Sequence, residues 1–139
     1  QYNQASKIQS VPRYRALAEL DGKVAIVTGA GRLRGIGRAT AVAMARLGAN
    51  VVVTGTGRDP GTYPEDEKAV AWKDIDSTAE QVEALGGSAL PLVVDVSDPQ
   101  QVQSIVDQTI SEFQRIDILV NNAAFAMLPA LAPIVDLNP

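Results

Sequence analysis

The sequence contains neither cysteine nor histidine. Without cysteine the chain can form no disulfide and no thiolate metal site, which fits an intracellular compartment. Without histidine it can hold no Ser-His-Asp triad, no histidine base and no imidazole-bound metal ion. It also lacks the roughly 18 consecutive apolar residues of a membrane helix, and residues 1–12 lack the apolar stretch of a signal peptide. We therefore expect a cytoplasmic protein that holds no metal and does not enter a membrane.

The chain has 12 Lys and Arg residues and 16 Asp and Glu residues, which give a net charge of −4. A nucleic-acid surface needs a basic face, so we expect no nucleic-acid partner. The 139 residues, of which 46% are hydrophobic, suffice for one domain with a packed core. We expect an N-terminal arm over residues 1–20 and the domain over residues 21–139. Because the chain starts at Gln1 and residues 134–138 look like the approach to another helix, we also expect a piece of a longer protein.

Four short apolar runs alternate with helical patterns. The runs cover residues 23–28, 50–54, 89–94 and 117–121. Each run is continuous rather than alternating, which is typical of parallel strands covered on both faces. Helical patterns cover residues 35–47, which Gly48 ends, a stretch around residues 75–85, which Gly86 and Gly87 end, and a stretch from Asp98 as N-cap with Pro99 at the first helical position. This alternation predicts an α/β fold, a Rossmann-type doubly wound parallel sheet with strand order 3-2-1-4.

Residues 58–73 form an unusually long connection between the second run and the second helix. Their proline, glycine and acidic residues predict an excursion over the surface near the cofactor edge of the sheet. We expect the acidic residues 65–67 to be solvated. For Trp72 a lid or a partner contact is conceivable, but packing against the domain is favoured. Arg38 and Arg46 are expected at the solvent edge of the first helix.

The segment from Thr28 to Gly37 reads Thr-Gly-Ala-Gly-Arg-Leu-Arg-Gly-Ile-Gly, directly after a strand and directly before a helix. A diphosphate needs free backbone amides, a close approach of the chain and the positive end of a helix. Glycine permits the close approach because it has no Cβ atom. Glycine-rich turns between a strand and a helix also occur for packing alone, but this context favours phosphate binding.

Three motifs together carry a family resemblance. They are Thr28-Gly29-Ala30 ahead of Gly35-Ile36-Gly37, Asp95-Val96 after the third run, and Asn121-Asn122-Ala123-Ala124 after the fourth. In this order and spacing, over residues 20–138, the chain resembles the short-chain dehydrogenase/reductase family. The family usually places three residues between the first glycine and Gly-x-Gly, whereas five separate Gly29 from Gly35. Counting from Gly31 restores the spacing, so either glycine can make the tight turn. Ala124 stands where the family usually has glycine.

The resemblance implies a role for each motif. The glycine-rich loop would wrap the diphosphate of a nicotinamide dinucleotide, Asp95 would accept a hydrogen bond from adenine, and the Val96 amide would contact the ring. Asn122 and Ala123 would line the ribose channel, and Asn121 would brace the sheet. Asp95 could instead be an ordinary strand-end acid, and both asparagines could serve only as turn residues. The candidate cofactor-binding residues are Gly29, Gly31, Arg32, Arg34, Gly35, Ile36, Gly37, Thr56, Arg58, Asp95, Val96, Asn122, Ala123 and Ala124.

The end of the second run bears on the choice of cofactor. An NAD site normally has an acidic residue there, which binds the ribose hydroxyls. In this chain that position is Gly55, and no carboxylate follows before Asp59. Thr56, Arg58 and one of Arg34 or Arg32 could instead converge on the 2′-phosphate of NADP. These arginines could also be solvated loop residues, but we expect NADP(H) to be favoured over NAD(H).

The catalytic pair of the resembled family, Tyr-x-x-x-Lys, is missing from this chain. Its tyrosines are Tyr2, Tyr14 and Tyr63, and the residues four positions later are Ser6, Ala18 and Glu67. In the family this tyrosine donates a proton to the substrate oxygen, and the lysine lowers its pKa. We therefore expect no catalytic residue here and a C-terminal catalytic half outside the chain. That half would also cover the apolar edge of the fourth strand.

Three functions follow from these observations. The favoured one is the cofactor-binding half of an NADP(H)-dependent oxidoreductase that acts on a small carbonyl or alcohol substrate. The alternative is a non-catalytic protein that senses nicotinamide nucleotides on the same fold. A purely structural half-domain is the third, and the intact glycine-rich loop speaks against it. The resemblance also implies a homo-oligomer.

Overall fold

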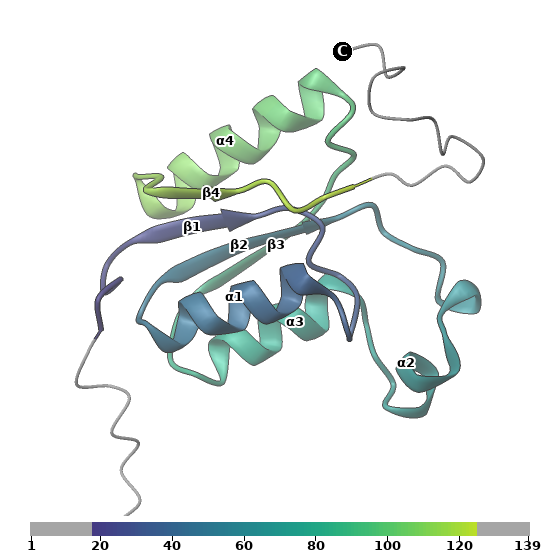
Figure 1. Cartoon of the computed structure of the whole chain (residues 1–139). Helices are drawn as coiled ribbons and strands as arrows, with labels where there is room; N and C mark the ends of the chain where they lie inside the picture. The colour runs from purple at the N-terminus through teal and green to yellow at the C-terminus, as the bar shows by residue number, and fades with distance from the viewer. Residues whose placement is uncertain (1–17, 125–139) are drawn as a thin grey trace, which may run out of the picture.

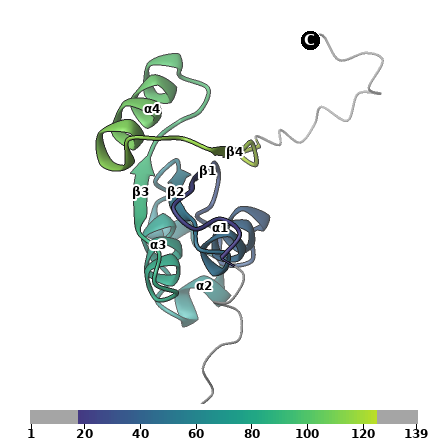
Figure 2. The ribbon, with the colours of Figure 1, turned by 90° about the vertical axis from the view of Figure 1, so that its left-hand side faces the viewer.

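The computed structural model describes residues 18–124, which form one parallel sheet with helices on both faces (Figure 1). The sheet has four strands in the order β3-β2-β1-β4. The strands are β1 (Val24–Val27), β2 (Asn50–Gly55), β3 (Ala89–Val93) and β4 (Ile118–Val120). Helices α1 and α3 cover one face, and α4 covers the other (Figures 1 and 2). The predicted Rossmann-type fold and its strand order are thereby confirmed.

The three main helices lie close to their predicted positions. They are α1 (Ile36–Arg46), α3 (Ile75–Glu83) and α4 (Pro99–Phe113). Helix α1 ends just before Gly48, whose φ of +97° suits a residue without a Cβ atom. Helix α4 begins at Pro99, and the carboxylate of Asp98 accepts a hydrogen bond from the Gln100 amide. None of the helices in residues 18–124 is long and apolar enough to span a membrane.

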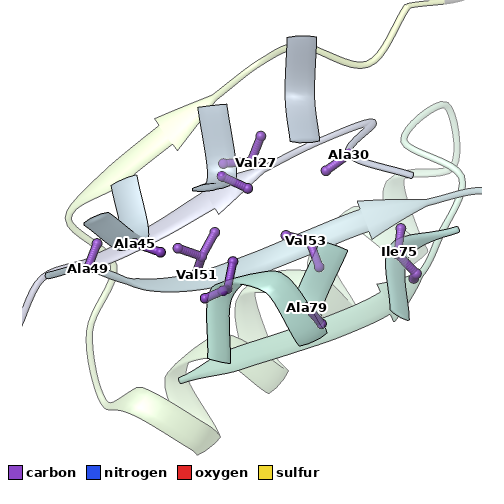
Figure 3. Packing of buried hydrophobic residues seen from close by; sticks show 10 residues of the cluster. Val27, Ala30, Ala45, Ala49, Val51, Val53, Ile75 and Ala79 are labelled. Carbon is purple, nitrogen blue, oxygen red and sulfur yellow. The ribbon is translucent and has the colours of Figure 1, made fainter. Parts of the chain in front are cut away.

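The core lies on both faces of the sheet, because successive strand residues point in opposite directions. On one face Val27, Val51 and Val53 pack against alanines of α1 and against α3 (Figure 3). On the other face Ile26 and Val52 belong to the cluster that α4 covers. The continuous apolar runs of the sequence therefore supply two cores at once.

The connection between β2 and α3 differs from its prediction. It contains a short 3-10 turn, η2 (Pro60–Thr62), and a short helix, α2 (Glu65–Ala69), which lies near the end of the sheet to which the strands point (Figure 1). The prediction of a solvated acidic run is wrong at Glu67, which is only 2% exposed because it pairs with groups of the domain. Trp72 is buried, so its predicted packing against the domain is confirmed.

Candidate functional site

A pocket of about 400 Å³ lies at the carboxyl ends of the four strands. Strand order reverses between β1 and β4, and such switch points are where open α/β sheets bind ligands. Residues that follow each strand line the pocket. They are Gly29, Gly31, Arg32, Gly35, Ile36, Thr54, Gly55, Thr56, Arg58, Asp74, Val94, Val96, Asn122, Ala123 and Ala124.

The pocket brings together eleven of the fourteen candidate residues. Arg34, Gly37 and Asp95 do not line it. Gly37 lies beneath the glycine-rich loop, where an added Cβ would come within 2.6 Å of the Gly29 carbonyl oxygen. Arg34 is exposed and pairs with Asp66 at 2.8 Å. The carboxylate of Asp95 accepts hydrogen bonds from the hydroxyl and amide of Ser97, which lower its pKa.

Of the two glycines that could make the tight turn, Gly29 is the one with a left-handed backbone. Its φ is +69°, and an added Cβ would lie 2.8 Å from the Ala123 Cα. Gly31 serves close packing instead, because a Cβ there would overlap the carboxylate of Asp74. The sequence could not distinguish these roles, since both depend on contacts with distant segments.

The N-terminus of α1 opens onto the pocket. Gly35 is its N-cap, and within the described residues no side chain caps the helix and no acidic residue lies in its first turn. The first amides of a helix have no partner within the helix, so these can bind an anion. Also in the pocket wall, the hydroxyl of Thr54 is buried and has no hydrogen-bond partner among residues 18–124. A buried polar atom of this kind calls for a ligand or water. Both features fit a dinucleotide.

The long connection between β2 and α3 holds the glycine-rich loop in place. The Gly31 carbonyl oxygen accepts hydrogen bonds from Trp72 Nε1 at 2.6 Å and from Arg58 Nη2 at 3.3 Å. The Leu33 amide donates to Glu67 Oε1 at 3.0 Å. The enlarged loop and the long connection therefore form one packed unit.

Arg58 is the centre of this unit. Its guanidinium bonds Asp74 Oδ1 through Nε at 3.1 Å and through Nη2 at 2.9 Å, and Glu67 Oε2 through Nη1 at 2.9 Å. It also lies over the ring of Tyr63, 4.6 Å from the ring centre. Burial alone would lower the pKa of Arg58, but the hydrogen bonds to the two carboxylates outweigh it and raise the pKa. Sequence reasoning missed both carboxylates, because nothing local marks them as buried.

Asn122 fastens the end of β4 to the glycine-rich loop. Its Nδ2 donates to the carbonyl oxygens of Thr28 at 2.9 Å and Gly29 at 3.0 Å. The amides of Asn122 and Ala123 both donate to the hydroxyl of Thr28. Asn122 thus has the structural role that the sequence left open for it, and the bracing role of Asn121 stays a prediction. Asn121 itself is exposed.

The pattern of the glycine-rich segment and the geometry around it agree with a comparison across protein families. A model of the family described as short chain dehydrogenase matches residues 23–138. This chain belongs to that family. The motifs around Gly29, Asp95 and Asn122 thus lie within the part of the chain that the family shares.

Relatives of this chain are known as sequences and as structures. Hydroxysteroid dehydrogenase-like protein 2 of Homo sapiens is 43% identical over 105 residues, which are 76% of this chain and 23% of that protein. The short chain dehydrogenase/reductase astE of Aspergillus oryzae is 44% identical over 120 residues, which are 86% of this chain and 39% of that protein. The chain therefore spans less than half the length of these relatives.

Two solved structures illustrate the shared fold. A short chain dehydrogenase from Mycobacterium thermoresistibile matches with a TM-score of 0.66 and 33% identity, over 86% of this chain and 38% of that one. A short chain dehydrogenase from Mycobacterium paratuberculosis, solved with NAD bound, matches with a TM-score of 0.61 and 35% identity, over 77% of this chain and 38% of that one.

Proposed function

We propose that residues 21–139 are the nicotinamide-dinucleotide-binding part of a short chain dehydrogenase/reductase. The observation that carries the proposal is the glycine-rich loop at residues 29–37, which leads into the uncapped N-terminus of α1 at the switch point of the sheet. Family membership and the NAD-bound relative support the same conclusion. The last fifteen residues of this range lie outside the described part of the chain.

The proposed binding mode assigns the diphosphate to the loop and to the first amides of α1. Hydrogen bonds to a charged group contribute about 1.5–3 kcal/mol each, whereas a helix dipole contributes about 0.3–1 kcal/mol. The amides therefore supply most of the affinity for the diphosphate. Val96 and Asp95 follow β3 and would contact the adenine, while Ala123 and Ala124 follow β4 and would line the path of the ribose.

The bound nicotinamide would supply or accept a hydride at the carbon of a small carbonyl or alcohol substrate. The residues described above bind and orient the dinucleotide, and Asn122 keeps the loop and β4 at a fixed distance. A proton donor of the Tyr-x-x-x-Lys type is absent from the sequence. The proposed reaction therefore draws its proton donor from residues outside this chain. A cytoplasmic location and a homo-oligomer are proposed from composition and family resemblance.

For the cofactor we propose NADP(H) over NAD(H). Two observations support this preference: Thr56 and Arg58 line the pocket, and no carboxylate follows β2 directly in the sequence. An arginine can bind a 2′-phosphate, whereas an acidic residue would repel it. The buried pairing of Arg58 with Asp74 works against the preference, because it places a carboxylate beside the arginine.

A titration of the purified protein with NADPH and with NADH, followed by nicotinamide fluorescence, tests both statements. Binding of NADPH with higher affinity than NADH is the expected result. Tighter binding of NADH would overturn the cofactor preference alone. If neither nucleotide binds, the proposed function itself is wrong.

A non-catalytic sensor of nicotinamide nucleotides on the same fold is the second candidate, and it would lack the Tyr-x-x-x-Lys pair throughout the whole protein. The two candidates differ in turnover. An enzyme oxidises NADPH in the presence of a suitable carbonyl compound, whereas a sensor binds NADPH and never consumes it. Absorbance at the nicotinamide band across a panel of aldehydes and ketones separates them.

A further inference from the structure

The carboxylate of Asp74 lies at the end of β2, although Asp74 itself precedes α3. A Cβ built on Gly55 would come 3.7 Å from Asp74 Oδ2, and the Arg58 amide lies 3.4 Å from the same oxygen. The built Cβ would also come 2.8 Å from Ile75 Cγ2, so the site has no room for a larger residue at position 55. Asp74 thus places a carboxylate where an acidic side chain after β2 would otherwise lie.

Of the two carboxylates that surround Arg58, only Asp74 lines the pocket. Glu67 is turned toward the Leu33 amide and already balances the guanidinium charge. Within the group of Arg58, Glu67 and Asp74 the charges therefore sum to −1, and Asp74 is the carboxylate of this group that lines the pocket, beside Arg58 and Arg32. A carboxylate in this place accepts a hydrogen bond from a ribose 2′-hydroxyl and repels a 2′-phosphate.

Asp74 has an unfavourable backbone conformation, which is common among residues that serve a binding site. Its φ of +57° and ψ of −130° form a conformation that residues with a side chain rarely adopt. Such conformations persist where surrounding contacts enforce them, and they cluster at ligand-binding sites. Here the bonds from the Arg58 guanidinium hold the carboxylate in place.

We propose that Asp74 is a specificity-determining residue that favours the free 2′-hydroxyl of NAD(H) and opposes the attraction of Arg58 for the 2′-phosphate of NADP(H). The inference rests on the proposed binding of nicotinamide dinucleotides. In the native protein Asp74 keeps the preference for NADP(H) small. Removal of the Asp74 charge should therefore increase the preference for NADP(H) over NAD(H).

The variant Asp74→Asn tests the inference, because it keeps an oxygen that accepts bonds from Arg58 and loses the charge. The measured quantity is the ratio of the Kd of NADH to the Kd of NADPH, which does not depend on the fraction of folded protein. We expect this ratio to rise at least about tenfold, as one charge facing a phosphate at short range predicts. The rise should shrink at high salt.

Two further variants complete the experiment. Asp74→Gly also removes the carboxylate and accepts a positive φ without strain, so it covers the case in which the asparagine variant fails to fold. The control is Asp76→Asn, which removes an exposed carboxylate from the first turn of α3 and should leave the ratio unchanged.

The outcomes separate the inference from the proposed function. If both nucleotides bind the native protein and the ratio stays the same in both Asp74 variants, the inference is wrong and the proposed function stands. A ratio that moves equally in Asp76→Asn would also overturn it, since the effect would then be one of total charge. If the native protein binds neither nucleotide, the inference about Asp74 and the proposed function are both wrong.

Discussion

Thr28 and Thr54 lie at the ends of neighbouring strands, and their hydroxyl groups differ in hydrogen bonding. The hydroxyl of Thr28 accepts hydrogen bonds from the amides of Asn122 and Ala123 and lies 3.3 Å from the Val120 carbonyl oxygen, to which it donates. The hydroxyl of Thr54 is fully buried and has no partner among the described residues. One residue holds the site together, and the other leaves a polar atom in the pocket wall.

Replacement of Thr54 by valine should therefore leave the unfolding free energy unchanged or raise it by up to about 1 kcal/mol, because an unpaired buried hydroxyl contributes nothing favourable. The same change should weaken NADPH binding, since the ligand loses a partner. Urea unfolding and fluorescence titration measure the two effects. The matched control is Thr28→Val, which leaves the Ala123 amide without its acceptor and the Asn122 amide with only the Val120 carbonyl oxygen, and should cost about 1–3 kcal/mol of unfolding free energy. An undiminished NADPH affinity in Thr54→Val would show that the hydroxyl takes no part in binding.

Residues of the site differ in how far the sequence could reveal them. The glycines and Asn122 were found because their motif is local and has a fixed spacing. Asp74 was missed because it lies far along the chain from Gly55 and reaches the pocket only through its pairing with Arg58. A local sequence pattern cannot reveal a contact between residues that lie this far apart in the chain.

At the scale of elements, the connection at residues 58–74 acts as a support for the glycine-rich loop. Its helix α2 is too short to be stable alone, so contacts with the rest of the domain must fix it. Trp72 makes the shortest of these contacts, at 2.6 Å to the Gly31 carbonyl oxygen, and Arg38 lies over its ring.

The variant Trp72→Phe keeps an aromatic side chain and removes the N–H that reaches Gly31. If this bond holds the loop ready for the diphosphate, affinity for NADPH and NADH should fall alike, by about two- to tenfold, as the net contribution of one hydrogen bond predicts. Titrations with both nucleotides, well below the melting temperature, measure the effect. A fall for one nucleotide only, or a lower melting temperature with unchanged affinities, would contradict this role of Trp72.

The main strands and helices were predictable because their apolar periods and end residues are local signals, as with Asp98 and Pro99 at the start of α4. The interior of the long connection was not, because its proline, glycine and acidic residues look like those of a solvated loop. The buried Glu67 has two partners, the Leu33 amide of the distant glycine-rich loop and the guanidinium of Arg58 at the start of the connection itself.

At the scale of the whole molecule, the short strand β4 is joined to β1 at both ends. At one end Asn122 bonds the loop after β1. At the other, Asp117 accepts hydrogen bonds from the Val24 amide at 2.8 Å and from the guanidinium of Arg115. The hydrogen bonds from Arg115 and then from Val24 lower the pKa of Asp117 from its ordinary value near 3.8 to about 2.

The lowered pKa predicts how stability depends on pH. Because the folded state holds the charged form, Asp117 contributes stability above the ordinary pKa near 3.8, and this contribution is lost as the pH falls toward about 2. The variant Asp117→Asn should be less stable than the native protein at pH 6, and the two should converge below pH of about 2. Urea unfolding across this range measures the difference. A constant gap at all pH values would show that the charge is not responsible.

The pairing of the glycine-rich loop with residues 58–74 also limits how this protein can be re-engineered. A chimera that received the loop alone would leave the Leu33 amide without the Glu67 acceptor, and one that received the connection alone would keep the Arg58–Glu67 pair but lose the Leu33 amide as a donor to Glu67 Oε1. A transfer of cofactor selectivity to another protein of this fold therefore requires that the glycine-rich loop and residues 58–74 are exchanged together.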